Sequence, residues 1–379
     1  MARTPLAIYV HWPYCARICP YCDFNVYKQR EDNDLVSAII QDLSYWREQS
    51  GKRHVTSVHF GGGTPSLLGA QDIERILAAV DENWGLAAEV EIALEANPDD
   101  CDVIKWQAYK QAGISRLSLG VQTFSDGALK MLGRNHDSMA AKKALAAARD
   151  IFAQVSLDLI YGHKGQTLQD WTSDLDITLA AAPDHISAYQ LTIEPTTAFG
   201  RAAERGDERA VDDDQSAAFY DITKARLTSE GYEHYEVSNY AKPGARSCHN
   251  LSYWQGHDYV GVGPGAHGRI TQSGTRIATV AAMRPRDYTA QVASNGHGIA
   301  EKDILSPQDW AEEYLIMGLR ILEGISISRY EALSGTPLNR DIIDELKGLG
   351  FVQMDQDRLF ATPQGRLLLN TVSAKLLGV

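Results

Sequence analysis

Strand-like and helix-like segments alternate six times within the first 230 residues, and this alternation limits the fold more than any other feature of the chain. Each expected strand is a short apolar run, and each is followed by a segment with apolar residues at helical spacing. The expected strands cover residues 6–11, 55–60, 90–95, 114–120, 155–161 and 185–193. Regular βα alternation predicts a parallel sheet covered by helices, which is either doubly wound or curled into a barrel.

Chemically distinctive residues follow these strands one after another, and their positions favour the barrel. In a βα barrel, functional side chains gather at the carboxyl ends of the strands. Three cysteines follow the first expected strand, a glycine-rich segment at 61–65 follows the second, and polar residues stand in or at the end of the next three. We therefore predict an α/β fold built on a partial, six-unit (β/α)6 barrel with one active face.

The pattern changes after about residue 232. Residues 233–300 are rich in glycine and are typical of short strands and tight loops, which predicts a β-rich segment. Helical periodicity returns after Ser306, and two strand-like runs near residues 352 and 360 predict a hairpin among these helices. Helices with a small hairpin indicate a winged-helix-like α+β module, so the predicted domains are residues 1–232, 233–300 and 301–379.

Winged-helix modules often bind DNA, but the charge of this chain argues against a nucleic-acid partner. The formal net charge is -13 at pH 7, and from Ser306 onward ten acidic residues face seven Lys or Arg. Nucleic acid is a polyanion, and binding it needs a basic surface. No apolar run approaches the roughly 20 residues that cross a bilayer, and the first residues show no secretory signal pattern. We therefore expect a cytoplasmic protein without a transmembrane segment.

Three of the five cysteines lie within eight residues, in the order Cys15-x3-Cys19-x2-Cys22. In the reducing cytosol, clustered cysteines are typical of a metal site rather than of disulfides. Three thiolates on one loop can bind three irons of a [4Fe–4S] cluster. No fourth cysteine follows nearby, so the fourth iron is left open for a small chelating ligand. The alternative is a zinc site, which needs a fourth ligand such as His11.

This cysteine motif, placed after the first strand of a βα barrel, resembles that of the radical S-adenosylmethionine (SAM) superfamily. In that superfamily the open iron binds the amine and carboxylate of SAM, and reduction of the cluster cleaves SAM to a 5′-deoxyadenosyl radical. Four further segments resemble the branch that contains oxygen-independent coproporphyrinogen III oxidase: Ile8–Pro13, Gly61–Ser66, Gly120–Gln122 and Leu157–Gly162. The resemblance covers nearly the whole chain, including a C-terminal module typical of that branch.

The resemblance implies a set of SAM-binding residues at the matching positions. Backbone groups at Gly62 and Gly63 can approach the methionine amine because glycine has no side chain, and Thr64 lies beside them. Arg134 matches an arginine that meets the methionine carboxylate. The other matching positions contact ribose or lie near adenosine or the second SAM of the oxidase: Glu95, Gln122, Asp158, Tyr9 and Tyr21. Turn glycines, a surface cation and helix-capping carboxylates are the plainer alternatives.

Two features separate this chain from the oxidases of the branch. Those oxidases carry a fourth cysteine two residues after the third, where this chain has Phe24. We also expect this chain to lack their longer N-terminal extension. The segment that begins at His249 reads His-Asn-Leu-Ser-Tyr-Trp, and this HNxxYW motif resembles the signature of the HemW family of heme chaperones. An imidazole can bind heme iron, and aromatic rings can lie on a porphyrin face. The resemblance thus implies heme binding by His249 with Tyr253 and Trp254, and ordinary core packing is the alternative.

The function implied by the resemblance is that of a heme chaperone with a [4Fe–4S] cluster and SAM. Its partners would be heme and heme-accepting proteins such as respiratory enzymes, which would bring it to the membrane surface without an anchor. Two alternatives stay open: oxygen-independent coproporphyrinogen III oxidase, which forms protoporphyrinogen IX, and a radical SAM enzyme acting on another substrate. Phe24 and the HNxxYW motif weigh against the oxidase, and the acidic charge weighs against RNA as the other substrate.

Overall fold

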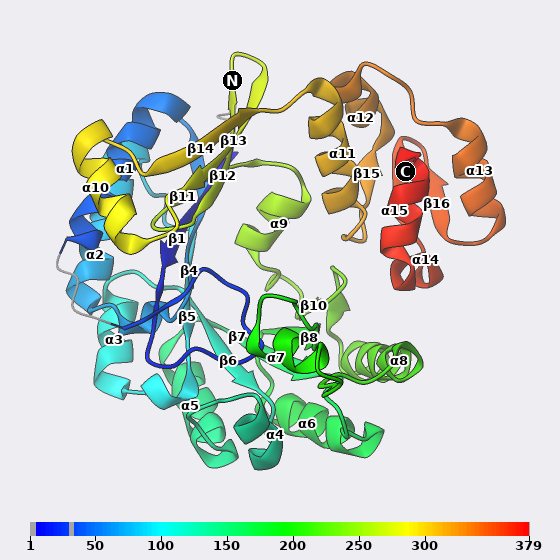
Figure 1. The fold of residues 1–379 in the computed structure, drawn as a ribbon, viewed down its shortest axis with the longest axis horizontal. Helices are drawn as coiled ribbons and strands as arrows, with labels where there is room; N and C mark the ends of the chain where they lie inside the picture. The colour runs from blue at the N-terminus through cyan, green and yellow to red at the C-terminus, as the bar shows by residue number, and fades with distance from the viewer. Residues whose placement is uncertain (1–4, 30–33, 379) are drawn as a thin grey trace.

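One large curved sheet forms the body of the computed structural model, which describes residues 5–29 and 34–378 (Figure 1). Six of its strands lie side by side in chain order and run parallel: β1 (Pro5–Trp12), β4 (His54–Gly62), β5 (Glu91–Ala96), β6 (Arg116–Gln122), β7 (Gln154–Tyr161) and β8 (His185–Gln190). The predicted βα alternation and partial barrel are confirmed. The sheet ends at β14 on one edge and at β9 on the other, so the two edges do not pair.

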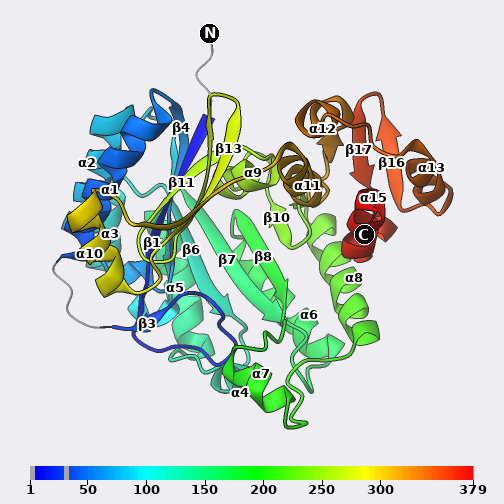
Figure 2. The same ribbon diagram turned by 45° about the horizontal axis from the view of Figure 1, so that its top comes forward.

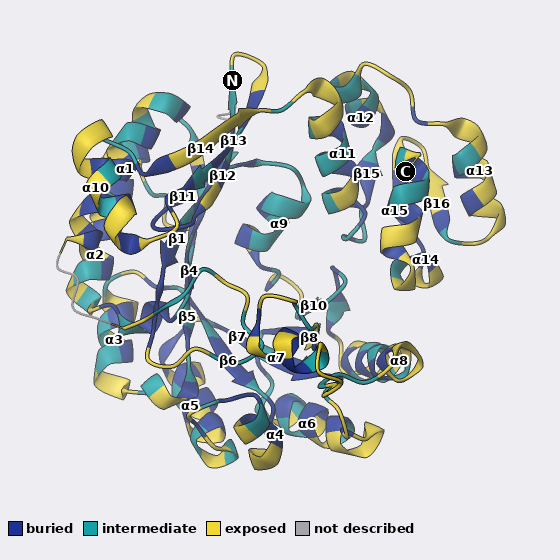
Figure 3. Ribbon diagram, viewed as in Figure 1, coloured by how far each residue is buried: buried dark blue, intermediate teal, exposed yellow. Residues whose placement is uncertain are grey.

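Helices cover the outer face of the parallel strands (Figures 1 and 2). They are α1 (Leu35–Ser50), α2 (Ala70–Trp84), α3 (Val103–Gln111), α5 (Ser138–Ile151), α6 (Leu168–Ala181) and α8 (Asp213–Ser229). Each turns an apolar stripe toward the sheet, which in α2 consists of Ile73, Ile76, Leu77 and Val80 at helical spacing. The strands are accordingly buried, whereas the helices expose their outer faces (Figure 3).

The predicted β-rich segment is not a separate sheet. β11 (Asp258–Val262) pairs in parallel with β1, on the side opposite β4. β12 (His267–Gln272), β13 (Thr275–Ala281) and β14 (Ile299–Ile304) then extend the same sheet by antiparallel pairing, and α10 (Pro285–Asn295) joins the last two. At the far edge, β10 (Asn239–Ala241) and β9 (Glu233–His234) add to β8. The domain boundaries stay a prediction, although the sheet runs across the one at residue 232.

A short helix, α9 (Cys248–Trp254), lies on the inner side of the sheet (Figures 1 and 2). It contacts β1, β4 and β11 on one side and α11 (Pro307–Gly318) on the other. Ser247 begins the helix by accepting a hydrogen bond from the backbone N–H of Asn250 at 3.2 Å. The HNxxYW motif is therefore helical and internal, whereas the sequence placed it among short strands.

The C-terminal part has a core of its own, which includes Leu315, Ile325, Leu359 and Val372. Its further elements are β15 (Ile325–Ser326), α12 (Ile327–Ser334), α13 (Arg340–Gly348), β16 (Val352–Asp355), β17 (Arg358–Ala361), α14 (Pro363–Leu367) and α15 (Leu369–Leu377). The antiparallel strands β15, β17 and β16 among helices give the predicted winged-helix-like arrangement. No helix among the described residues is both long and apolar enough to cross a membrane.

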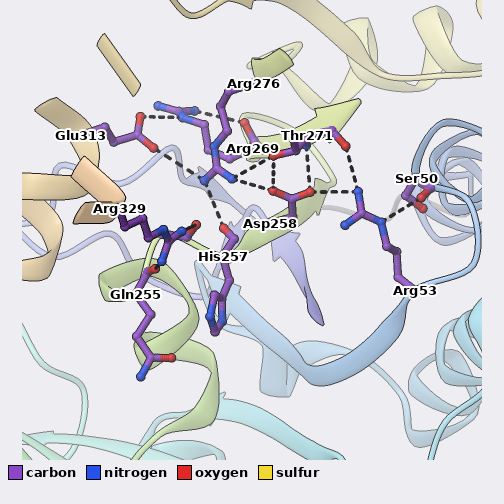
Figure 4. Close-up of polar contacts among 12 residues, drawn as sticks. Ser50, Arg53, Gln255, His257, Asp258, Arg269, Thr271, Arg276, Glu313 and Arg329 are labelled. Carbon is purple, nitrogen blue, oxygen red and sulfur yellow. Dashed lines mark hydrogen bonds and ion pairs between the residues drawn. The ribbon is translucent and has the colours of Figure 1, made fainter. Parts of the chain in front are cut away.

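A polar network attaches this part to the sheet (Figure 4). Asp258 on β11 forms ion pairs with Arg276, at 2.6 Å, and with Arg53, at 3.0 Å. Arg269 on β12 reaches Glu313 on α11 at 2.8 Å. Arg329 on α12 donates to two carbonyl oxygens at the end of α9, those of residues 255 and 256, at 2.9 and 3.1 Å. The network therefore ties α9 and strands β11 to β13 to the C-terminal helices.

Candidate functional site

A cavity of about 520 Å³ lies inside the curved sheet, toward the carboxyl ends of the parallel strands. This volume is typical of a site for a small molecule. The loop between β1 and α1 forms one wall of the cavity and carries the three cysteines. The glycine-rich segment after β4 and inward side chains of β4 to β8 form the rest, including His59, Glu95, Ser118, Asp158 and Tyr189.

The inner face of the sheet carries many polar side chains, which is unusual for parallel strands. In β4, Val58 and Phe60 belong to the apolar core, whereas Ser57 and His59 lie on the opposite face. The same spacing places His185, Ser187 and Tyr189 of β8 along the cavity. Parallel strands covered on both faces normally carry apolar side chains on both. The polar alternation therefore indicates a surface that receives a ligand.

The cysteine loop is closed at its base by two short strands. β2 (Tyr14–Cys15) pairs with β3 (Tyr27–Lys28), and the backbone N–H of Gln29 donates to the carbonyl of Cys15 at 2.9 Å. A tight turn, with a 3.2 Å hydrogen bond from the N–H of Cys22 to the carbonyl of Cys19, brings those two residues together. Cys15 is buried and the other two are partly exposed, and all three line the cavity.

This loop fits an iron–sulfur cluster better than a single zinc ion. Among residues 5–29 and 34–378, no three Cys, His, Asp or Glu side chains converge on one metal ion, whereas a cubane cluster binds its thiolates at separate corners. Both ring nitrogens of His11 are engaged, Nδ1 with Tyr9 Oη at 3.1 Å and Nε2 with the carbonyl of Asn25 at 2.9 Å. Burial raises the pKa of Cys22 to about 11, so binding to iron would release its proton.

The glycines at the end of β4 are required by close contacts with residues just before the cysteines. Gly62 has φ +106°, and a Cβ atom there would lie 2.6 Å from the ring of His11. A Cβ atom at Gly63 would lie 2.6 Å from the carbonyl oxygen of Tyr14. The N–H of Gly63 donates to Trp12 at 2.7 Å, and the next N–H donates to Tyr14 at 2.8 Å. The cysteine loop thus rests directly on this glycine backbone.

Glu95 extends from β5 toward the same glycines. Its Oε1 accepts a hydrogen bond from His59 Nε2 at 2.9 Å, and its Oε2 accepts one from the N–H of Gly62 at 3.3 Å. The side chain keeps 37% of its surface exposed, on the cavity side. Free lone pairs on this fixed carboxylate can accept hydrogen bonds from ligand hydroxyls.

Arg134 lies at the cluster end of the cavity, after the short helix α4 (Asp126–Met131). Its Nη2 donates to the carbonyl of Gly120 at 2.9 Å and also contacts Asn97. Its Nη1 lies 3.5 Å from Cys19 Sγ, and its Nε is buried without a partner in the described structure. A guanidinium with an unused donor beside the cysteines suits a carboxylate ligand.

Gln122 and Asp158 line the central part of the cavity. Gln122 has φ +69°, which is uncommon for a residue other than glycine and is frequent at functional sites. Burial raises the pKa of Asp158 to about 6, although hydrogen bonds from Ser187 and Ser118 oppose this effect. Near neutral pH the Asp158 carboxyl can therefore accept or donate a hydrogen bond.

The two tyrosines assigned by resemblance occupy different places. Tyr21 lines the cavity and packs against Phe199 of α7 (Ala198–Ala203), with ring centroids 6.4 Å apart. Tyr9 lies behind the cavity wall, where its ring stacks on His59 and His249 with centroids 6.1 and 6.0 Å apart. All the residues assigned to SAM line the cavity except Tyr9, which lies behind the ring of His59.

The HNxxYW residues do not form an open binding surface. His249 is 1% exposed, with Nδ1 3.0 Å from Ser57 Oγ and Nε2 2.6 Å from Tyr253 Oη. The guanidinium of Arg320 lies over Trp254, with its central carbon 4.6 Å from the centroid of the indole ring. Neither nitrogen of His249 is free for iron in this conformation, so heme ligation would require the imidazole to leave both partners.

No role was assigned from the sequence to several side chains that line the cavity: His59, Asn97, Tyr189 and Asn250. The signal that could have found His59 and Tyr189 is the polar alternation within otherwise apolar strands, since residues two apart in a strand share a face. Asn250 belongs to the HNxxYW motif and is the member of it that reaches the cavity wall.

Two family models and several known proteins match this chain. A family model for the radical SAM superfamily matches residues 9–177, and one for the HemN C-terminal domain matches residues 305–368. Heme chaperone HemW of Bacillus subtilis is 33% identical over 98% of this chain and 98% of its own length. HemW of Escherichia coli is 35% identical over 97% of each chain.

A eukaryotic relative and a solved structure extend the comparison. The mitochondrial radical S-adenosyl methionine domain-containing protein 1 of Mus musculus is 36% identical over 99% of this chain and 88% of its own. The structure of coproporphyrinogen III oxidase (HemN) from Escherichia coli, described as a radical SAM enzyme, is 25% identical and covers 99% of this chain and 90% of its own. Its TM-score of 0.83 shows that the two chains share one fold over the matched length.

Proposed function

Because this chain belongs to the HemW family within the radical SAM superfamily, we propose that it is a heme chaperone that binds heme and passes it to acceptor proteins. Membership of the superfamily implies a [4Fe–4S] cluster and SAM. The observation that carries the proposal is the cavity itself, in which three cysteines, a glycine cradle and an arginine with a free donor lie at one end.

The cluster would be held by Cys15, Cys19 and Cys22, which line the cavity and would leave one iron without a cysteine ligand. A bound cluster supplies an electron for cleavage of a carbon–sulfur bond of SAM chelated at that iron. Gly62 and Gly63 keep the backbone close to this place, because a Cβ atom at either would collide with neighbouring residues.

SAM would lie along the cavity between the glycines and β7. Arg134 has an unused buried Nε and suits the methionine carboxylate. Glu95 and Asp158 offer carboxyl oxygens to the ribose hydroxyls, and Gln122 and Tyr21 line the same wall. Thr64, which is buried beside Gly63, receives a hydrogen bond from Asn97 at 3.2 Å.

Heme would be bound through the HNxxYW motif, with His249 as axial ligand and Tyr253 and Trp254 beside the porphyrin. This assignment is supported by the relatives named as heme chaperones. In the described conformation His249 is held by Ser57 and Tyr253, so we propose that loading of heme includes a shift of α9. The acceptors would be heme proteins such as respiratory enzymes, met at the membrane surface.

The oxidase is the rival function, because the solved structure of HemN shares the fold. Phe24 stands where the oxidases carry a fourth cysteine, and it is 62% exposed at the rim of the cavity. An exposed phenylalanine cannot replace a thiol in redox or acid–base chemistry. We therefore favour heme transfer over decarboxylation of coproporphyrinogen III.

The deciding experiment uses protein reconstituted with iron and sulfide without oxygen, together with SAM and a reductant. One sample receives heme and another receives coproporphyrinogen III. We expect saturable heme binding, seen as a Soret band, and no protoporphyrinogen IX. Binding should be lost in His249→Ala and kept in His234→Ala, which removes another buried histidine on β9, outside the cavity lining. Formation of protoporphyrinogen IX, or absence of saturable heme binding, would contradict the proposal.

A further inference from the structure

His59 connects the cavity to the HNxxYW helix by direct contacts on both sides. It projects from the inner face of β4 and lines the cavity. Its Nε2 lies 2.9 Å from Glu95 Oε1. Its ring stacks on that of His249, with centroids 4.7 Å apart and planes at 15°.

Two donors from β4 fix the Glu95 carboxylate, one at each oxygen. The N–H of Gly62 reaches Oε2 from the backbone, and His59 reaches Oε1 from a side chain. The backbone donor cannot move without the strand, whereas the imidazole can rotate about its own bonds. The orientation of the Glu95 carboxylate therefore depends on the contacts that hold the ring of His59 in place.

Stacking holds this ring, because hydrogen bonding fixes only one of its nitrogens. His59 Nδ1 is buried without a partner in the described structure. The ring lies against His249 and, less closely, against Tyr9, with planes at 20° and centroids 6.1 Å apart. His249 in turn is fixed at both nitrogens, by Ser57 of β4 and by Tyr253 of α9.

We propose that His59 and His249 are positioning residues for Glu95, so that the HNxxYW helix sets the affinity of the cavity for SAM. The inference rests on the proposed role of Glu95 toward the ribose hydroxyls. It gives the motif a second task, independent of heme: His249 supports the ring that aims the carboxylate. When His249 leaves Ser57 and Tyr253 to bind iron, the support is withdrawn and SAM binding weakens.

The test measures the dissociation constant for SAM on the cluster-loaded, heme-free protein by equilibrium dialysis. The change that SAM causes in the electron paramagnetic resonance spectrum of the reduced cluster is a second readout, since a general loss of stability would not alter it. His59→Leu removes the donor to Glu95, and His59→Gln keeps an N–H near the position of Nε2. His249→Ala removes the stacked ring, and His249→Phe keeps a ring.

Loss of one ligand-ordering hydrogen bond changes affinity by about tenfold. We expect His59→Leu and His249→Ala to raise the dissociation constant by about fivefold to tenfold, and His59→Gln and His249→Phe to stay within about twofold. The matched control is His234→Leu, because His234 is a buried histidine stacked on Tyr240 at 4.4 Å and outside the cavity lining.

The outcomes separate this inference from the proposed function. If the unaltered holoprotein binds no SAM, the proposed function fails together with the inference. If it binds SAM and the two disruptive variants bind it equally well, only the inference is overturned. It is also overturned if His59→Gln loses as much affinity as His59→Leu while circular dichroism shows both variants folded.

Discussion

Replacing Gly63 by alanine tests whether the cysteine loop depends on the glycine backbone beneath it. The added Cβ atom would lie 2.6 Å from the carbonyl oxygen of Tyr14 and 2.9 Å from that of Trp12. Both obstacles are backbone atoms, so no side-chain rotation relieves the contact. The backbone just before Cys15 and the backbone at Gly63 must therefore move apart.

The expected penalty has two parts. Overpacking of a buried site typically costs about 1–3 kcal/mol. Separation also stretches the hydrogen bonds from the N–H of Gly63 to Trp12 and from the N–H of Thr64 to Tyr14, 2.7 and 2.8 Å long, each worth about 1 kcal/mol. We expect Gly63→Ala to lower the free energy of unfolding by about 2–5 kcal/mol, a large share of the stability of a typical domain.

Urea unfolding of the cluster-free protein measures this penalty, and iron and sulfide content after anaerobic reconstitution measures the consequence for the cluster. The matched control is Gly127→Ala, in the exposed first turn of α4, where a Cβ atom meets only Ser125 Oγ at 3.9 Å. Removing a helical glycine should raise stability there by up to about 1 kcal/mol. A Gly63→Ala protein that unfolds like the original and binds its full complement of iron would refute the reasoning.

Three further predictions concern burial and coupling. Burial raises the pKa of Asp42 to about 7, so the folded state keeps a proton that the unfolded state loses above pH 4. The free energy of unfolding should therefore fall between pH 4 and pH 7, by on the order of 4 kcal/mol. Asp42→Asn should reduce this fall in urea titrations at several pH values. Arg116→Met should cost about 3–5 kcal/mol in the same assay because it leaves Glu91, 2.9 Å away and buried, without its cation, whereas Arg209→Met at an exposed pair should cost less than about 1 kcal/mol. Saturating heme should raise the dissociation constant for SAM, and SAM should weaken heme binding by the same factor; equal SAM affinity with and without bound heme would contradict the coupling.

The sequence predicted the local elements well because their signals are local. Strand and helix positions in the βα units follow from apolar spacing, and the observed strands begin and end within three residues of the predicted bounds. Apolar spacing over residues 363–377 predicts one helix, but the structure has two, which meet at Leu368, whose backbone (φ -116°, ψ 28°) leaves the helical region. No proline or glycine marks that break, so local patterns could not show it.

Long-range pairing was harder to predict. The strand β11 joins β1 although about 250 residues separate them in the chain, and no periodicity within either strand specifies that partner. The partners of His249 could not be predicted for a related reason. Its partners Ser57 and Tyr9 come from strands far away, and only the folded sheet brings them together.

The cysteine and glycine motifs were located correctly as neighbours because both follow parallel strands, whose carboxyl ends meet at one rim. His59 was overlooked because a histidine within a strand reads as an ordinary interruption of an apolar run. The role of His59 is recognised only from its hydrogen bond with Glu95 of the next strand, a residue that the sequence did single out.

The helix that carries the HNxxYW motif has only seven residues, from Cys248 to Trp254, and helices this short do not persist by themselves. Ser247 secures its first turn, and its last carbonyls depend on the guanidinium of Arg329, which is contributed by a segment more than seventy residues further along. The C-terminal part thus stabilises the helix that carries His249, through the hydrogen bonds of Arg329. Removing the chain from α11 onward would take away this support and leave the His249 imidazole on an unstable turn.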